Sequence, residues 1–169
     1  IAFTAVVEKP FVITSCGKIQ TISDFKKLAM QDFEEARGLF RSKQFSEVLK
    51  YEDVRVRNLY ANMRKWALDE RALEEFLVGI KQKEKIFLTL SAEIFEYRDV
   101  LEDKKGVLEI SKNTWGYIPI SVRTMGEFLS VDRTEISTED FVGNTYQLEY
   151  IIKKEQLHAG YNYGKLFVE

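Results

Sequence analysis

The spacing of hydrophobic residues changes once along the chain, near residue 85. From Thr21 to Ile80 the apolar residues recur every three or four positions, which predicts amphipathic helices. From Ile86 to Val168 they alternate with polar residues in short runs bounded by Gly, Asn, Asp or Ser, which predicts β-strands. The pattern therefore divides the chain into a helical unit over residues 21–84 and a strand-rich unit over residues 85–169.

Four helices are expected in the helical unit. Thr21 and Asp24 match the pattern of a hydroxyl residue followed by an acid that caps a helix start, and one apolar face continues from there to Phe40. A short helix from Ser46 to Tyr51 is expected next, and Asp53 and Asp69 are placed to cap the last two helices. The third helix, over residues 54–67, is expected to bury Val56, Leu59, Tyr60, Met63 and Trp66.

The first 20 residues have extended character. Ile1 to Val7 alternate as a strand does, and Pro10 interrupts the pattern before Phe11 to Ile13 resume it. Proline lacks the N–H that a central strand needs, so the segment is expected at a sheet edge or in a linker. We interpret residues 1–20 as the closing strand of a preceding module or as a linker, with docking on the C-terminal sheet as the alternative. The chain is accordingly expected to be a segment of a longer protein.

The strand pattern is clearest from Gly106 to Val122. Two strands are expected there, separated by a turn that carries Asn113 and Gly116, and a longer strand is expected from Tyr146 to Ile152. About seven short strands in this unit are typical of an immunoglobulin-like β-sandwich. The predicted fold class is therefore segregated α+β: a small antiparallel helical unit followed by an immunoglobulin-like sandwich that lacks the paired cysteines of antibody domains.

Composition and charge exclude several classes of protein. Hydrophobic residues make up 45% of the chain and charged residues 31%, which is typical of a globular protein and argues against disorder. The net charge of −2 gives no overall field that would attract nucleic acid. No apolar run approaches the roughly 20 residues that span a bilayer, so membrane insertion is not expected. The single Cys16 forbids an internal disulfide, which favours a reducing compartment such as the cytoplasm.

Four segments together resemble known bacterial modules. Leu157 to Val168 is similar to the last hairpin of bacterial immunoglobulin-like modules, and the combination of Leu73 to Leu77, Trp115 to Tyr117 and Thr138 to Asn144 resembles an uncharacterised family of large, mainly clostridial-type bacterial proteins, a domain family of unknown function. The resemblance implies immunoglobulin-like modules separated by helices. On this basis residues 1–13 end one module, residues 21–82 form a helical insert, and residues 85–169 form a second module. It implies no catalytic residue.

The residues give little support to catalysis, and no cofactor or metal is predicted. Neither a P-loop nor a Gly-x-Gly-x-x-Gly turn is present, and the glycines at Gly160 and Gly164 fit a β-turn. His158 is the only histidine and Cys16 the only cysteine, so the usual zinc ligand sets are impossible. The acidic pairs on the helices are interpreted as a solvated face, as is the locally basic set Arg55, Arg57, Arg64 and Lys65.

Four aromatic residues at expected turns are the candidate ligand-binding residues: Trp115, Tyr117, Tyr161 and Tyr163. Exposed aromatics stack on sugar rings or anchor a partner protein, whereas the alternative is ordinary core and turn packing. We expect a non-enzymatic structural or protein-interaction module of a larger bacterial protein, whose partners are other protein domains of the same or another chain. The alternatives are a carbohydrate-binding module that uses these aromatics and an accessory domain of an enzyme whose active site lies elsewhere.

Overall fold

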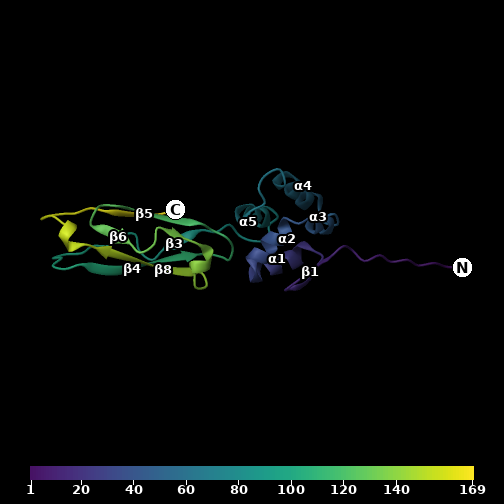
Figure 1. Ribbon diagram of the computed structural model, residues 1–169, viewed down its shortest axis with the longest axis horizontal. Coiled ribbons are helices and arrows are strands. Elements are labelled where there is room, and N and C mark those ends of the chain that lie inside the picture. The colour runs from purple at the N-terminus through teal and green to yellow at the C-terminus, as the bar shows by residue number, and fades with distance from the viewer. The chain divides into compact units, whose positions relative to one another are not determined.

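A computed structural model describes residues 1–169 as an α+β fold with five α-helices and several antiparallel sheets. The chain divides into two compact units, Ile1–Lys85 and Ile86–Glu169 (Figure 1). The first unit contains one β-hairpin and all the α-helices, and the second contains strands β3 to β9. No helix has both the length and the hydrophobicity that crossing a bilayer requires.

The first unit opens with a hairpin that packs with the helices. It is formed by β1 (Val12–Thr14) and β2 (Gly17–Ile19), and the helices are α1 (Ile22–Gln31), α2 (Phe33–Phe40), α3 (Lys43–Leu49), α4 (Val54–Met63) and α5 (Glu70–Gly79). β1 contacts α3, β2 contacts α1, and Ile19 is buried. The hairpin is thus part of the helical unit, whereas the sequence pattern was interpreted as placing residues 1–20 in a preceding module or a linker. Ile1 to Val7 form no regular element.

The helix expected to run from Thr21 to Phe40 is broken at Asp32. The backbone of Asp32 is extended, with φ −146° and ψ 91°, and its carboxylate accepts a hydrogen bond from the backbone N–H of Glu35. Asp32 therefore ends α1 and caps α2 at the same point. Buried apolar residues occur on both sides of the break, at Leu28 and Ala29 in α1 and at Ala36 and Leu39 in α2, which is why the hydrophobic spacing alone predicted one helix.

Side-chain caps fix the other helix starts. The predicted capping box of Thr21 and Asp24 is confirmed, and so are the predicted caps at Asp53 and Asp69. Ser42 caps α3 by accepting a hydrogen bond from the backbone N–H of Phe45. The short helix predicted from Ser46 therefore begins earlier, at Lys43.

Aromatic rings form the core of the helical unit. Phe25, Phe40, Phe45, Tyr60 and Phe76 are all buried, with ring centroids 4.4 Å apart for Phe25–Phe45 and 5.2 Å apart for Phe40–Phe76. Trp66 is absent from this core. It is 79% exposed because α4 ends at Met63, so Trp66 no longer lies on the apolar face of the helix. The prediction that Trp66 is buried was wrong.

The second unit is built from two antiparallel sheets. The four-stranded sheet has the order β3 (Leu88–Leu90), β4 (Lys104–Lys112), β8 (Thr145–Ile152) and β6 (Leu129–Val131), and the three-stranded sheet has the order β7 (Glu135–Ile136), β5 (Ile120–Met125) and β9 (Lys165–Val168). Two short 3₁₀ helices, Thr138–Asp140 and Lys154–Gln156, lie between strands along the chain. The predicted strands on either side of Asn113 and Gly116 are present as β4 and β5.

One hydrophobic cluster draws side chains from both sheets. Leu108, Ile110 and Leu148 come from the four-stranded sheet, and Ile120 and Val122 come from the three-stranded sheet. Their positions alternate along β4, β5 and β8, as the period-two pattern predicts. The buried faces of the two sheets therefore share one core.

The segment from Glu93 to Tyr97, which was expected to extend an edge strand, forms no strand. Its side chains pack on Tyr150 instead: the ring centroids of Phe95 and Tyr150 are 5.2 Å apart, and the Tyr97 and Tyr150 hydroxyls share a hydrogen bond. Tyr150 lies directly across the strand pair from Gly106. A glycine at this position leaves the space that the tyrosine ring fills.

Candidate functional site

The four candidate aromatics form two pairs at opposite ends of β5. Tyr161 and Tyr163 lie in the loop before β9, whose first residue, Lys165, is opposite Met125. Trp115 and Tyr117 precede β5 at its other end, which begins at Ile120. Because each residue of a strand adds about 3.3 Å, the two ends of β5 are about 17 Å apart. The four aromatics therefore do not form a single platform.

Tyr161 and Tyr163 are presented to solvent as a stacked pair. Their ring centroids are 6.1 Å apart, their planes are 13° from parallel, and the residues are 83% and 84% exposed. Between them, the Asn162 amide accepts a hydrogen bond from the His158 N–H at 3.0 Å and donates one to the His158 carbonyl at 2.8 Å. The side-chain amide thus fixes the loop that carries the two rings.

The loop also approaches the backbone closely where it enters β9. A Cβ atom on Gly164 would lie 2.9 Å from the Met125 carbonyl oxygen and 2.8 Å from the ring of Phe128. Only glycine fits this position without displacing its neighbours. The close approach holds the Tyr161–Tyr163 loop against the turn between β5 and β6.

Trp115 and Tyr117 are half-buried. Gly116, between them, is buried and has a φ of 125°, a value that glycine adopts readily and other residues rarely do. This geometry is that of a tight turn packed against the protein. For Trp115 and Tyr117, therefore, ordinary turn packing is a better description than an exposed binding surface.

The reactive side chains considered from the sequence belong to different units, Cys16 to the first and His158 to the second. His158 is exposed, and its Nδ1 is 2.8 Å from the carbonyl oxygen of the next residue, Ala159. The Cys16 thiol donates to Gln31 Oε1 at 3.0 Å, while the neighbouring Ser15 binds Glu35 through both its N–H and its hydroxyl. No group of three or more His, Cys, Asp or Glu side chains is arranged to hold a metal ion.

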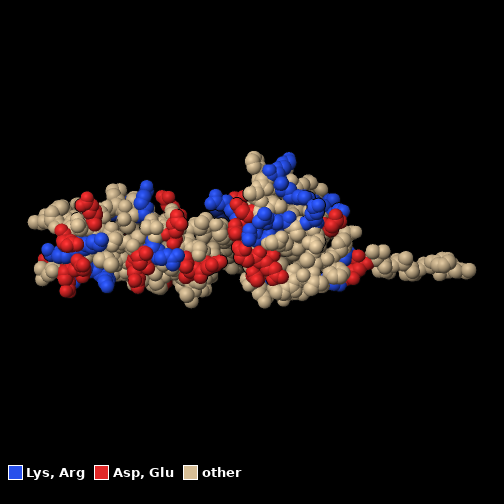
Figure 2. All heavy atoms as spheres, viewed as in Figure 1, with Lys and Arg blue, Asp and Glu red and all other residues tan.

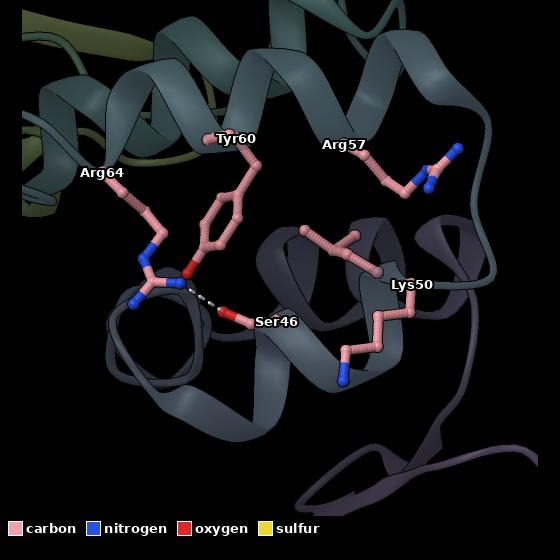
Figure 3. A pocket seen from close by; sticks show the side chains of 7 residues that line it. Ser46, Lys50, Arg57, Tyr60 and Arg64 are labelled. Atoms are coloured by element: carbon pink, nitrogen blue, oxygen red, sulfur yellow. Dashed lines mark hydrogen bonds between the residues drawn. The ribbon is translucent and has the colours of Figure 1, made fainter.

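A hollow of about 180 Å³ lies between α3 and α4 of the helical unit; we call it the basic hollow (Figure 3). It is lined by Ser46, Leu49, Lys50, Arg57, Tyr60, Ala61 and Arg64. The sequence identified Arg57 and Arg64 only as a locally basic stretch. It did not indicate the hollow, because Ser46 lies in α3 and Lys50 is the C-cap of α3, and both meet the arginines only after the helices pack.

The residues around the basic hollow differ in how they are held. Tyr60 donates from its hydroxyl to the Phe40 carbonyl oxygen at 2.6 Å, and burial raises the pKa of this tyrosine. Arg64 donates from Nη1 to Ser46 Oγ at 3.1 Å. Lys50 donates to a carboxylate oxygen of its neighbour Glu47 at 2.7 Å, and this hydrogen bond raises the pKa of Lys50. The Arg57 guanidinium, by contrast, makes no hydrogen bond or ion pair.

A second, wider hollow of about 440 Å³ lies where α4 ends and α5 begins. The exposed ring of Trp66 and the thioether side chain of Met63 lie beside Asp69, Arg71 and Glu75. Its charged side chains are of both signs, so the hollow has no consistent electrostatic preference.

Comparison with known proteins identifies a family. A search of curated proteins finds no match. A model of the N-terminal part of a family of unknown function, DUF5717, matches residues 1–169. The expected resemblance to a domain family of unknown function is confirmed at that level. Since the match covers the whole sequence, the chain belongs to the DUF5717 N-terminal family.

Proposed function

We propose that this domain is a non-enzymatic protein-interaction module of a larger bacterial protein. In this proposal the two sheets of the second unit form an immunoglobulin-like β-sandwich, supported by the hydrophobic cluster that they share. The observation that carries the proposal is the exposed, stacked pair of Tyr161 and Tyr163. The expected partners are other protein domains of the same or another chain.

The tyrosine pair has the properties of an interface anchor. Tyrosine is enriched at protein interfaces because it offers a large apolar face and a hydroxyl at low cost in side-chain entropy. The hydrogen bonds of Asn162 fix the loop before any partner arrives, so less conformational freedom is lost on binding. Two large, exposed rings on a fixed loop are therefore best explained as a contact surface.

Photo-crosslinking in the full-length protein tests this proposal. Tyr163 is replaced by the aromatic photocrosslinker benzoylphenylalanine, and the exposed residue Gln156 is replaced in the same way as a control. We expect a discrete protein adduct from position 163, weakened by Tyr161→Ala, and none from position 156. Equal crosslinking from the two positions would contradict the proposal.

Carbohydrate binding is the second candidate, because the same two parallel rings are suited to stacking on the faces of sugar rings. Electrophoresis through gels that contain individual polysaccharides distinguishes it from protein binding. Retardation by one polysaccharide, abolished when Tyr161 and Tyr163 are both changed to Ala, would support the carbohydrate function. Unchanged mobility in every gel would reject the carbohydrate function and leave the protein-interaction proposal standing.

A further inference from the structure

The basic hollow between α3 and α4 combines an apolar floor with a cationic rim. The buried side chains of Leu49 and Tyr60 form the floor, and Lys50, Arg57 and Arg64 surround it. In Figure 3, Arg64 lies at one end of the hollow and Arg57 and Lys50 lie at the other. A ligand that matches both parts needs an apolar group and negative charges on either side of it.

The floor is rigid before a ligand arrives. The Tyr60 ring belongs to the aromatic core, 5.2 Å from the Phe45 centroid, and its hydroxyl is bound to Phe40. The Arg64 guanidinium is held by Ser46 and lies 5.9 Å from the centroid of the Tyr60 ring. Because these groups are already in place, a ligand loses little of its binding energy to ordering them.

The spacing of the two arginines restricts the ligand further. Arg57 lies in α4 and Arg64 is the C-cap of that helix, seven residues later, so they are about 10 Å apart along the helix axis at 1.5 Å per residue. Their guanidinium groups point to opposite ends of the hollow in Figure 3, so a single small anion does not contact both. In an extended peptide, side chains on one face recur at every second residue, so carboxylates two residues before and two residues after an apolar side chain flank it on the same face. At about 3.3 Å per residue these two carboxylate positions are about 13 Å apart, close to the spacing of the two arginines.

The surrounding charge has the same sign. Residues 41–65 contain seven Lys or Arg and three Asp or Glu, a net charge of +4. Figure 2 shows basic side chains gathered over the part of the helical unit where Figure 1 draws α3 and α4. The hollow's volume of about 180 Å³ suits one inserted side chain. It is smaller than the roughly 300 Å³ or more of pockets that enclose a small-molecule ligand.

We propose that the basic hollow binds an acidic segment of a partner protein. An aliphatic or aromatic side chain of that segment rests on Leu49 and Tyr60, and the flanking carboxylates pair with Arg57 at one end and Arg64 at the other. Arginine is suited to this role because its planar guanidinium pairs with a carboxylate through two parallel hydrogen bonds. The inference rests on the proposed protein-binding function, but it does not depend on the tyrosine pair of the other unit.

Fluorescence anisotropy of the complete 169-residue chain tests the inference with a labelled peptide, Gly-Glu-Asp-Leu-Phe-Asp-Glu-Gly. We expect salt-sensitive binding that is weakened roughly tenfold by either Arg57→Gln or Arg64→Gln. Arg55→Gln is the matched control, because it removes the same charge from the same helix outside the hollow; we expect it to change the Kd by less than about twofold. Circular dichroism confirms that each variant is folded.

Two variant peptides test the contributions of the cationic rim and the apolar floor separately. Replacement of the acidic residues by Gln and Asn is expected to abolish binding, and replacement of Leu and Phe by Ser is expected to weaken it roughly tenfold or more. Equal losses from Arg55→Gln and Arg57→Gln would overturn the inference, because they would show attraction to general positive charge. Absence of peptide binding at millimolar concentration, or tighter binding of inorganic phosphate or of a single-stranded oligonucleotide, would also overturn it.

These outcomes are distinguishable from failure of the proposed function. Loss of the crosslink at Tyr163 removes the evidence for the tyrosine surface and leaves the peptide result unchanged. Failure of the peptide to bind, with the Tyr163 crosslink intact, overturns only the basic hollow as a docking site.

Discussion

Lys83 and Glu74 form an ion pair inside the helical unit. The Lys83 side chain is fully buried, the Glu74 side chain is 14% exposed, and Lys83 also donates to the Glu84 carbonyl oxygen at 3.0 Å. A buried pair adds little net stability relative to an apolar pair of the same size, because both charges were removed from water. Removal of one partner is much more costly, since the other charge stays buried.

We therefore expect Glu74→Ala to lower the free energy of unfolding by about 3 kcal/mol or more. Urea denaturation followed by circular dichroism measures the change. Glu75→Ala, at an exposed position of the same helix, is the control and is expected to change stability by no more than about 0.5 kcal/mol. If both variants lowered the free energy of unfolding by a similar amount, the effect of Glu74→Ala would not come from loss of the ion pair.

Tyr60 makes the stability of the helical unit depend on alkaline pH. Burial raises its pKa above the ordinary value of 10.0, so the folded state retains the phenol proton more tightly than the unfolded state does. The stability from this group is complete below pH 10 and is lost as the pH rises through the folded-state pKa. At pH 8 we expect Tyr60→Phe to cost about 1 kcal/mol, through loss of the hydrogen bond to Phe40.

Above pH 10 the difference between the wild type and Tyr60→Phe should shrink, because only the wild type has this phenol to deprotonate. Urea denaturation at pH 8, 9, 10 and 11 measures both proteins. Tyr51→Phe, at an exposed tyrosine of the same unit, is expected to follow the wild-type curve. A constant difference over the whole pH range would contradict the assignment to Tyr60.

At the scale of elements, the break between α1 and α2 depends on one side chain. Asp32 supplies the acceptor for the Glu35 N–H at the start of α2. We expect Asp32→Ala to lower the free energy of unfolding by about 1 kcal/mol, as is usual for the loss of an N-cap, whereas Asp32→Asn should stay close to the wild type. Urea denaturation compares the two variants. Equal losses would indicate that the charge, and not the cap, is important.

The β4–β8 pair depends on the absence of a side chain at Gly106. A Cβ atom there would lie 2.3 Å from Cζ of Tyr150, in a ring that is also packed against Phe95. We expect Gly106→Ala to lower the stability of the second unit by about 1–3 kcal/mol, because the ring must move. Gly38→Ala, in α2 with no atom in the way, should instead raise stability by about 0.5–1 kcal/mol. Denaturation midpoints of the two variants that shift in the same direction would contradict this account.

The sequence predicted those elements whose signals are local. A helix cap involves residues within one turn, and a strand alternates at every second position, so Asp53, Asp69 and the faces of β4 and β8 were predicted correctly. The break at Asp32 was not, because an acid among apolar residues is compatible with both a helix surface and a cap. Trp66 was misplaced for a related reason: the apolar spacing continues beyond Met63, where the helix ends.

The candidate sites could not be predicted fully, because the spacing of residue types along the sequence does not show which distant residues meet in the fold. Tyr161 and Tyr163 are two residues apart, so their proximity follows from the local chain. Their distance from Trp115 depends on how β5 and β9 pair. The basic hollow depends on the packing of α3 against α4, which brings Ser46 close to Arg64 across 18 positions of sequence.

At the scale of the whole molecule, the small net charge conceals two units of opposite sign. Residues 1–85 contain 16 Lys or Arg and 13 Asp or Glu, which gives a net charge of +3. Residues 86–169 contain 9 Lys or Arg and 14 Asp or Glu, which gives a net charge of −5. The weak overall field deduced from composition is therefore an average over unlike surfaces. An anionic ligand that the complete chain would not attract strongly is still attracted to α3 and α4 at short range.

The division between Lys85 and Ile86 predicts that residues 86–169 fold without the helices. Each unit has a separate core: aromatic in the first, and mainly aliphatic and shared by two sheets in the second. Since small domains with their own core unfold cooperatively, we expect residues 86–169 alone to show a single urea transition, reported by the fluorescence of Trp115, the one tryptophan in that unit.

In the complete chain, Gly106→Ala should shift this transition and leave the helical signal at 222 nm unchanged, whereas Glu74→Ala should do the reverse. Coincident shifts of both signals in both variants would show that the two units unfold as one.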